Sequence, residues 1–291
     1  MSVLSGFTIV RNAVTLDYPI VPAIRSILPI CSEVVVNVGR SDDGTRELIA
    51  GIGDSRIRIL DTVWDESSGG ATLARETNRA MAACRGRFGL YIQADEVLHE
   101  TGAELLADRV RTWDRDALLE GLLVDYRHFY GDFHTLATNR HWYRREVRVV
   151  RLGSSDIRAF GDAQGFRVGE GLRRVRARVT GAMMFHYGWA QPPAVLRQKH
   201  EASKALFGEH QGKLEQRAQA PALEWTPGLR RFTGAHPAAA AAWVADRSGG
   251  SNGRALGPRR IRPGDIRFYL SDWIERATGV RLFEYRNYVL V

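Results

Sequence analysis

The segment Glu33–Thr45, with the sequence EVVVNVGRSDDGT, decides the fold class of this 291-residue chain. Its first half is a mostly apolar run, which is typical of a strand buried on both faces of a parallel sheet. Its second half is a polar loop that ends in Asp43-Gly44-Thr45, and this sequence opens a helix that runs through Ile52. A strand, a loop and a helix in this order form the repeating unit of an α/β protein.

The same unit recurs on both sides of this segment. Strands are predicted at Phe7–Val10, Arg56–Leu60 and Phe88–Gln93, and helices at Val14–Pro29 and Ala71–Cys84. This order predicts a mainly parallel sheet with helices on both faces. Because ligands bind at the carboxyl ends of the strands in such sheets, the polar residues that follow the strands should share one rim.

The rest of the chain has a different pattern. Strands are predicted at Gly121–Tyr130, Glu146–Leu152 and Val175–His186, and a helix at Pro192–Phe207. We expect one domain over residues 1–207, followed by a loop-rich, partly helical extension over residues 208–291. In that extension the clearest signals are an amphipathic helix at Asp265–Ala277 and a short strand near Tyr288.

The composition excludes several classes of protein. Hydrophobic residues make up 44% of the chain and charged residues 25%, which rules out intrinsic disorder for most of it. Two cysteines are too few for a disulfide framework or a zinc cluster, and no signal peptide or membrane span is visible, so we expect a cytoplasmic protein. The net charge of +8 predicts anionic partners such as phosphates, nucleic acid or a membrane surface.

Four polar segments carry side chains that could bind a ligand or a metal ion, or act as a catalytic base, at the predicted rim. Ser41–Thr45 places two carboxylates at a helix N-terminus, where they could cap the helix or accept hydrogen bonds from a ribose. Asp95 follows a buried strand, where it could cap a helix or hold a divalent cation with substrate phosphates. His186 ends a strand among aromatic residues, where it is either packed or ligating. Asp162, between two glycines, is either a turn residue or a general base whose pKa desolvation raises.

The four segments occur in this order in family 2 glycosyltransferases with the GT-A fold, which the chain resembles from residue 6 to about residue 200. The resemblance implies a Rossmann-like, mixed but mainly parallel sheet flanked by helices. It also implies that residues 1–100 are a nucleotide-binding half and residues 101–207 an acceptor-side half. In that family a polar turn after the first strand holds the nucleobase, and Ile9-Val10-Arg11-Asn12 resembles this turn, with Ile9, Arg11 and Asn12 as contacts.

Two further motifs of the family would bind the nucleotide. The Asp-x-Gly-Ser-x-Asp-Gly-Thr loop resembles residues 38–45, which have Val38 in place of the first Asp, so Asp42 or Asn37 would replace its contact beside Asp43. The Gly-x-x-x-Ala-Arg-Asn helix resembles residues 70–76, and Arg75 would approach the base or the diphosphate.

The resemblance also implies a metal centre. Gln93-Ala94-Asp95 resembles the Asp-x-Asp motif that binds the metal and the nucleotide-sugar, with Gln93 in place of the first Asp. Asp95 would therefore hold Mn²⁺ or Mg²⁺, with Glu96 as a reserve ligand. His186 has the sequence position of the His that completes the metal site in GT-A enzymes.

The implied reaction is transfer of a sugar, with inversion, from a UDP-sugar or another nucleotide-sugar to an acceptor hydroxyl. Gly161-Asp162 resembles the Glu-Asp pair of inverting members, so Asp162 would be the catalytic base, with Asp156 and Glu170 as alternatives. Trp142, Tyr143 and Trp189 could stack on sugar faces or belong to the core.

The acceptor stays open among a saccharide, a lipid-linked compound and a small metabolite. The extension could cover the acceptor site or mediate a homodimer, and its arginines could contact a membrane surface. A catalytically inactive nucleotide-binding relative is an alternative, because family carboxylates are replaced at Val38 and Gln93. A nucleotidyltransferase would need a Gly-rich, Lys-bearing loop near the first strand, which is missing. Nucleic acid is not expected as a partner, since no recognition motif accompanies the arginines.

Overall fold

The first half of the chain forms the parallel part of the sheet that the sequence predicts. The computed structural model describes residues 4–65, 67, 71–113, 116, 118–153, 156–207, 225–248 and 261–291. Four parallel strands lie side by side in the order Ile57–Thr62 (β3), Glu33–Gly39 (β2), Leu4–Val10 (β1) and Phe88–Tyr91 (β4). Every residue of β1, β2 and β4 is buried, as expected for strands that are covered on both faces.

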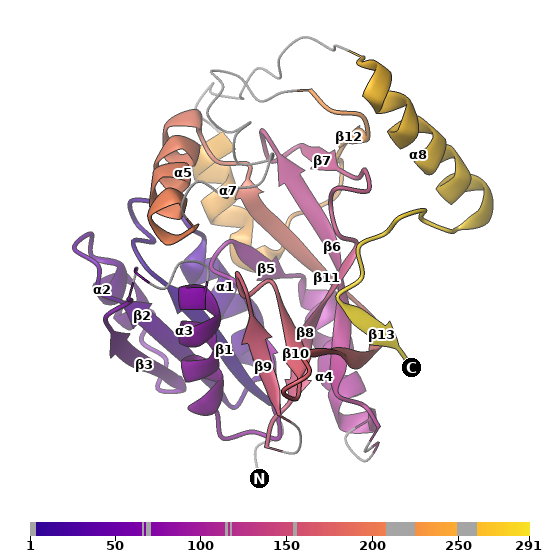
Figure 1. The fold of residues 1–291 in the computed structure, drawn as a ribbon. Coiled ribbons are helices and arrows are strands. Elements are labelled where there is room, and N and C mark those ends of the chain that lie inside the picture. Colours follow the sequence, from indigo (N-terminus) through magenta and orange to yellow (C-terminus); the bar gives the residue numbers. More distant parts are fainter. Residues whose placement is uncertain are drawn as a thin grey trace.

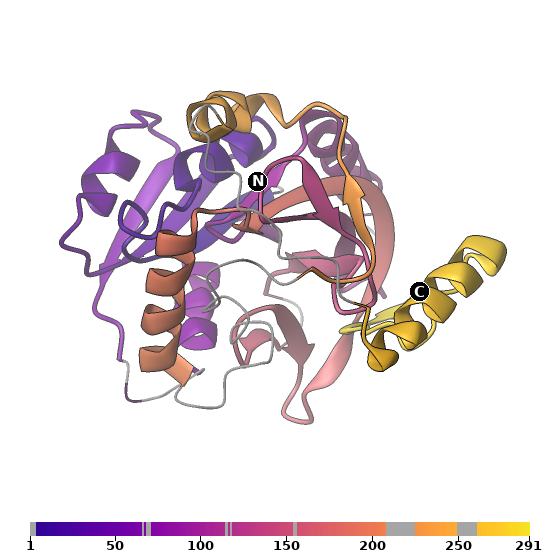
Figure 2. The same cartoon turned by 90° about the horizontal axis from the view of Figure 1, so that it is seen from above.

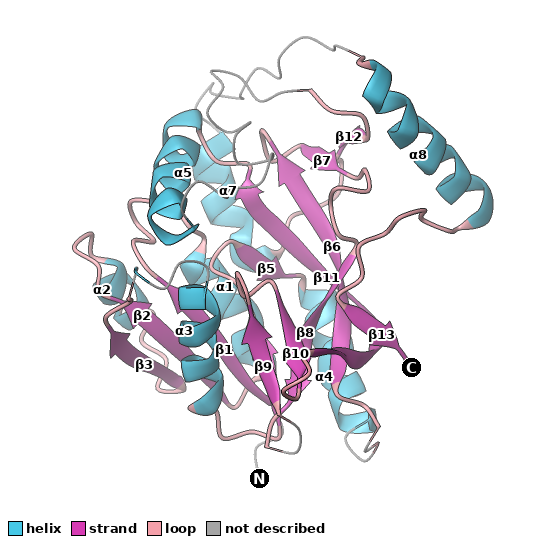
Figure 3. Ribbon diagram, in the orientation of Figure 1, coloured by secondary structure: helices cyan, strands magenta, loops and turns pink. Residues whose placement is uncertain are grey.

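Helices cover both faces of this parallel part (Figure 3). They span Ile20–Ile27 (α1), Thr45–Ala50 (α2), Ala71–Ala82 (α3) and Glu100–Trp113 (α4). Val34 and Val36 of β2 belong to the same core cluster as Ile24 of α1, whereas Val35 between them packs in the cluster that contains Ala74 of α3. Successive side chains of β2 therefore bury opposite faces of the sheet, which explains why the strand is mostly apolar.

The first helix begins later than the sequence predicts. The apolar spacing predicts a helix from Val14, but α1 begins at Ile20. Asn12 and Asp17 have positive φ angles of 53° and 48°, and a right-handed helix cannot run through residues in the left-handed region. Residues 12–18 are therefore a turn that follows β1.

The second half of the chain adds antiparallel strands and makes the sheet mixed (Figure 1). Beyond β4 the order continues with Arg145–Arg151 (β8), Gly121–Tyr130 (β6), Arg173–Trp189 (β11), Gly165–Val168 (β10) and Ile157–Phe160 (β9). The short strands Glu96–Leu98 (β5) and Thr135–Ala137 (β7) pair with β11 and β6. The structure confirms the predicted fold class, a mixed α/β sheet of GT-A type with helices on both sides.

Segments from the C-terminal quarter join the same sheet. Leu229–Arg231 (β12) pairs with β7, and Tyr288–Leu290 (β13) pairs in parallel with β11. The remaining elements are Pro193–Phe207 (α5), Ala241–Ser248 (α7), Ile266–Thr278 (α8) and the 3₁₀ turns Leu28–Ile30 (η1), Ala238–Ala240 (η3) and Pro263–Asp265 (η4). Figure 2 shows α5 and α8 on opposite sides of the molecule.

The predicted extension lies only partly within the described residues, because 208–224 and 249–260 fall outside them. Its division from residues 1–207 stays a prediction, as do the dimer and the membrane contact. Trp273 and Leu270 of α8 are exposed. Across the described residues, no helix is both long enough and apolar enough to span a membrane.

A carboxylic acid is buried in β8 without a matching side-chain donor. Glu146 has none of its surface exposed, and no described side chain donates a hydrogen bond to either of its carboxylate oxygens. Burial raises the pKa of Glu146 to about 8, and the nearby carboxylates of Glu96 and Asp162 add to this, although Arg148 opposes it. The folded protein therefore holds Glu146 protonated at neutral pH.

Replacing Glu146 by Gln is expected to stabilise the protein at alkaline pH. Unfolding returns the pKa of Glu146 to about 4.5, so the stability linked to its protonation is full below pH 4.5 and is lost as the pH rises through 8. The neutral amide avoids this loss, which is on the order of a few kcal/mol. Thermal unfolding at pH 5 and pH 9 measures it: the gain in Tm of the variant over wild type should grow with pH, and a pH-independent difference contradicts the assignment.

Candidate functional site

One cavity, with a volume of about 790 Å³, lies at the carboxyl ends of β1, β4 and β11. The strand order reverses between β1 and β4, because β2 and β3 extend the sheet on one side and β4 on the other. In open α/β sheets this is where ligands bind. The cavity brings together eight of the predicted site residues: Ile9, Arg11, Asn12, Gln93, Ala94, Asp95, Asp162 and His186.

Asn37, Asp42, Asp43 and Arg75 do not line this cavity. Asn37 is fully buried and donates from Nδ2 to the backbone oxygen of Glu76 at 2.9 Å. Asp42 is exposed, and Arg75 lies 3.3 Å from the carboxylate of Asp65. Their predicted contact with the nucleotide stays a prediction, and Gly70 of the same helix motif lies outside the described residues.

Asp43 organises the turn beside the cavity. Its Oδ1 accepts a hydrogen bond from the backbone N–H of Thr45 at 3.1 Å, and its Oδ2 accepts one from Thr15 N–H at 2.8 Å. These bonds lower the pKa of Asp43 against the raising effect of burial. The N-cap residue of α2 is Gly44, which has no side-chain cap, so Asp43 is not the N-cap; its two bonds instead tie the start of α2 to the turn after β1.

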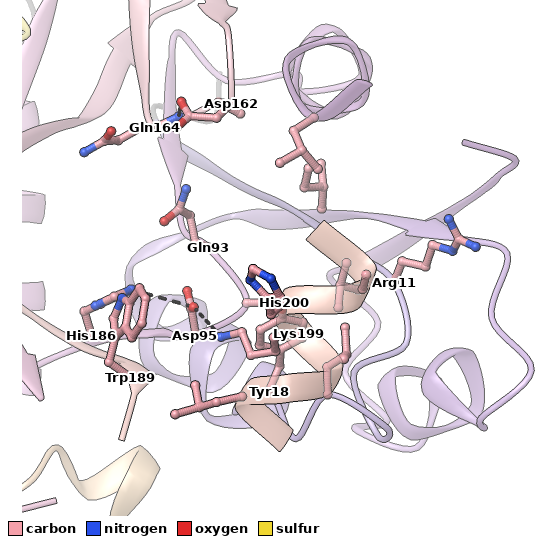
Figure 4. Close-up of a pocket in the computed structure, with 18 of the residues that line it drawn as sticks. Arg11, Tyr18, Gln93, Asp95, Asp162, Gln164, His186, Trp189, Lys199 and His200 are labelled. Atoms are coloured by element: carbon pink, nitrogen blue, oxygen red, sulfur yellow. Dashed lines mark hydrogen bonds and ion pairs between the residues drawn. The ribbon is translucent and has the colours of Figure 1, made fainter. Parts of the chain in front are cut away.

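The centre of the site is Asp95, which two basic side chains face (Figure 4). Its Oδ2 lies 3.4 Å from Lys199 Nζ and 3.6 Å from His186 Nε2. The Asp95 and Lys199 side chains are each 17% exposed. Burial by itself raises the pKa of Asp95, but the charges of Lys199 and His186 outweigh it and hold this pKa well below its usual range. Asp95 is therefore an anion at neutral pH.

A second histidine sets the orientation of His186. His128 Nε2 lies 2.8 Å from the carbonyl oxygen of Tyr143, which only accepts, so His128 donates there. Burial lowers the pKa of His128 well below its ordinary value and keeps the ring neutral. Its Nδ1 therefore accepts a hydrogen bond from His186 Nδ1, 3.1 Å away. This leaves His186 Nε2 facing Asp95.

The backbone next to this group must be glycine. A Cβ atom on Gly188 would lie 2.5 Å from Asp95 Oδ2 and 2.8 Å from His186 Nε2, which are distances that real Cβ atoms do not show. The carbonyl oxygen of Gly188 also accepts a hydrogen bond from Lys199 at 3.1 Å. The absence of a side chain at this position lets strand β11 pass directly beside the Asp95 carboxylate.

The fit of the predicted metal ion to this group is incomplete. Asp95 and His186 have the right ligand atoms, and a carboxylate with an imidazole is a common pair for Mn²⁺. However, among the described residues no three or more His, Cys, Asp or Glu side chains form a group that could hold a metal. The ammonium of Lys199 pairs with Asp95 Oδ2, the carboxylate oxygen that also faces His186.

Glu96, the predicted reserve ligand, has a structural position instead. It is fully buried and forms a two-bond ion pair with the guanidinium of Arg148, at 2.7 and 3.0 Å. Tyr126 donates to its Oε1, and the backbone N–H of Gln93 donates to its Oε2. Both carboxylate oxygens of Glu96 thus accept hydrogen bonds from protein groups. These bonds fix the turn that carries Asp95.

The opposite side of the cavity is the turn between β9 and β10, which carries Asp162 and Gln164 (Figure 4). Asp162 Oδ1 accepts a hydrogen bond from the backbone N–H of Gln164 at 3.1 Å. Asp162 is exposed at the rim of the cavity and is not a buried carboxylate. The rival carboxylates Asp156 and Glu170 are also exposed, but neither lines the cavity.

Several cavity residues are not among the predicted site residues. The most important is Lys199, with Tyr18 and His200 beside it. A signal for two of them existed, because Leu196, Lys199 and His200 follow the i, i+3, i+4 spacing of one helix face in the predicted helix Pro192–Phe207. Trp142, Tyr143 and Trp189 line the cavity too, although Trp142 is buried and packs edge-on against Trp189.

Comparison with known proteins finds structural likeness at low sequence identity. No protein-family model matches the chain, and no curated protein matches it. The chain is similar to a crystal structure of S. aureus TarS residues 1–349, with 13% identity and a TM-score of 0.43 over 74% of this chain and 69% of that one. It is also similar to S. aureus TarS 1–349 in complex with UDP-GlcNAc, with 20% identity and a TM-score of 0.35 over 44% of this chain. That alignment covers 35% of the TarS chain, and alignments with two other TarS structures cover 22% and 36%.

Proposed function

We propose that the protein is a nucleotide-sugar-dependent glycosyltransferase that transfers the sugar with inversion to an acceptor hydroxyl. The observation that carries this proposal is that three separated motifs meet in one cavity. These are the turn Ile9–Asn12, the segment Gln93–Asp95 and the turn at Asp162. The sequence order of these motifs resembles family 2 glycosyltransferases, and their meeting at the strand ends agrees with a common ligand.

Different parts of the cavity contact the nucleoside, the diphosphate and the acceptor hydroxyl. The turn Ile9–Asn12 receives the nucleoside, and the basic side chains at Asp95 face the diphosphate. Asp162, on the opposite rim, takes the proton of the acceptor hydroxyl while the hydroxyl oxygen attacks the anomeric carbon. The bond from that carbon to the diphosphate oxygen breaks, and its electrons leave with the nucleoside diphosphate. Attack on the face opposite the leaving group inverts the anomeric centre.

A divalent metal stays a prediction for this site. Asp95 and His186 are the two side chains that would ligate it, and their chemistry suits Mn²⁺ better than Mg²⁺, because one ligand is an imidazole nitrogen. When bound, such an ion would neutralise charge on the leaving diphosphate. The transfer described above uses the protein's own side chains, among which Lys199 pairs with Asp95 Oδ2 at 3.4 Å.

Nucleoside diphosphates and their sugars are expected to raise the melting temperature of the protein. A ligand that binds only the folded state, at 100 times its Kd, stabilises it by about 2.7 kcal/mol. Thermal shift with UDP, GDP, dTDP and CDP, and with the corresponding nucleotide-sugars, should identify one nucleoside series. Slow hydrolysis of the matching nucleotide-sugar then separates an active enzyme from an inactive relative. A protein that responds to nucleoside triphosphates alone contradicts the proposal and favours a nucleotidyltransferase.

A further inference from the structure

The cation nearest to the Asp95 carboxylate is the side-chain ammonium of Lys199. Lys199 extends from α5 into the cavity, where Nζ lies 3.4 Å from Asp95 Oδ2 and 3.1 Å from the carbonyl oxygen of Gly188 (Figure 4). The ring of Tyr18 lies beneath it, with Nζ 4.6 Å from the ring centroid. An acidic oxygen, a carbonyl and an aromatic face together form a site for a compact cation.

The residue type suits this position. The whole sequence has 41 Lys plus Arg, but Lys occurs only at positions 199, 204 and 213. A lysine ammonium is a point charge on a long stem, whereas a planar guanidinium spreads its donors over a wide fork. A Cβ atom on Gly188 would lie 2.5 Å from Asp95 Oδ2, so the backbone whose carbonyl oxygen accepts from Lys199 passes directly beside the carboxylate.

We propose that Lys199 is the cation that this site presents to the diphosphate, in the position where the resemblance implies a divalent metal ion. The inference rests on the proposed function. An ammonium has three N–H donors, and two of them are accounted for by Asp95 and Gly188. No described residue accepts a hydrogen bond from the third, so it can donate to a phosphate oxygen, and the positive charge stabilises the diphosphate as it leaves the sugar.

Charge balance supports this role over simultaneous use of a metal. Asp95 and Lys199 neutralise each other, so a divalent ion bound to the same oxygen would face a positive charge in a largely buried site. Asp95 then acts as a positioning residue that keeps the ammonium charged and in place. Burial lowers the pKa of Lys199, and the carboxylate of Asp95 opposes that shift.

The test is isothermal titration of UDP, or of the nucleoside diphosphate that the thermal-shift screen identifies, in EDTA and in MnCl₂. Wild-type protein should bind it with nearly the same affinity in both. Lys199→Met should weaken binding in EDTA about 10- to 150-fold, as expected for the loss of a hydrogen bond to a charged group. The matched control is Arg197→Met, which removes an exposed cation from the same helix and should leave the affinity unchanged.

A second measurement uses Mn²⁺ alone and needs no nucleotide. Electron paramagnetic resonance should detect little Mn²⁺ bound to wild type. It should detect Mn²⁺ bound to Lys199→Met, because Asp95 and His186 are then left without the ammonium. If Lys199→Met does not fold, two other measurements test the role of Lys199. They are the titration of nucleoside diphosphate into Lys199→Arg, and the comparison of wild-type binding in EDTA and in MnCl₂.

The outcomes separate this inference from the proposed function. Wild type that binds UDP only with MnCl₂, together with an unaltered Lys199→Met, overturns the role of Lys199 and leaves the glycosyltransferase proposal standing. Wild type that binds no nucleoside diphosphate in either condition overturns both. Binding in EDTA that depends on Lys199 supports both.

Discussion

Replacing Asp162 by Asn is expected to lower the turnover number about 10²- to 10⁴-fold, which is the usual contribution of a general base. Asn has the same shape, and its side-chain oxygen still accepts the hydrogen bond from Gln164 N–H that Asp162 now accepts at 3.1 Å. The turn between β9 and β10 should therefore keep its conformation. What the variant loses is the ability to take the proton of the attacking hydroxyl.

The measurement is the release of nucleoside diphosphate from the nucleotide-sugar, with water or an identified alcohol as the acceptor. Asp162→Asn should reduce kcat while the affinity for the nucleoside diphosphate, measured by titration, stays within a small factor of wild type. Asp156→Asn and Glu170→Gln are the matched controls, because both carboxylates are exposed near the same hairpin but do not line the cavity. Near-normal turnover in Asp162→Asn, or a large loss of turnover in Glu170→Gln alone, would show that Asp162 is not the catalytic base.

The sequence predicts the core of the fold, because each of its elements has a local pattern of apolar residues. The apolar runs of β1, β2 and β4 and the helical spacing in α3 each identify one element within a dozen residues. The start of α1 was less accessible, since the left-handed conformation of Asn12 and Asp17 depends on contacts from elsewhere, including Ser41 Oγ, which accepts a hydrogen bond from Asn12 N–H at 3.0 Å. Helix α4 and the division of residues 157–168 into a hairpin were not predicted.

The site depends more on pairing between distant segments than on local pattern. His186 comes beside Asp95 because β11 pairs antiparallel with β5 in a register that sets His186 opposite Glu96. Their separation of about ninety residues makes that register invisible to periodicity, and the family resemblance alone suggested the pair. Lys199 was missed for a different reason, because a lysine on an amphipathic helix is ordinarily solvated.

A buried ion pair joins the two sides of the cavity. Arg148 and Glu96 both have no exposed side-chain surface. Arg148 also donates from Nη1 to the carbonyl oxygen of Gln164 at 2.9 Å, while Glu96 accepts from the backbone N–H of Gln93. Through these bonds the turn that carries Asp162 is connected to the segment that carries Asp95. The charged pair therefore links two segments of the site, although a buried ion pair contributes little net stability by itself.

Replacing Arg148 by Met is expected to reduce the free energy of unfolding by about 3–5 kcal/mol, because it leaves the Glu96 carboxylate buried without its partner. Urea denaturation measures the change. Arg46→Met is the control, since Arg46 and Asp61 form an exposed pair, with 50% and 58% of their side chains exposed, whose loss should change the free energy of unfolding far less than the loss of the buried pair.

The double variant Glu96→Gln with Arg148→Met distinguishes an unpaired charge from a lost volume. If the cost arises from the buried carboxylate, neutralising Glu96 should recover part of the stability lost in Arg148→Met, because no net charge then remains in the interior. The double variant should nevertheless bind nucleoside diphosphate more weakly than wild type, since Arg148 no longer ties the Gln164 turn to Glu96. If the losses in free energy of unfolding of the two single variants simply add in the double variant, the effect of Arg148 arises from packing. Its guanidinium covers the rings of Tyr91 and Tyr126.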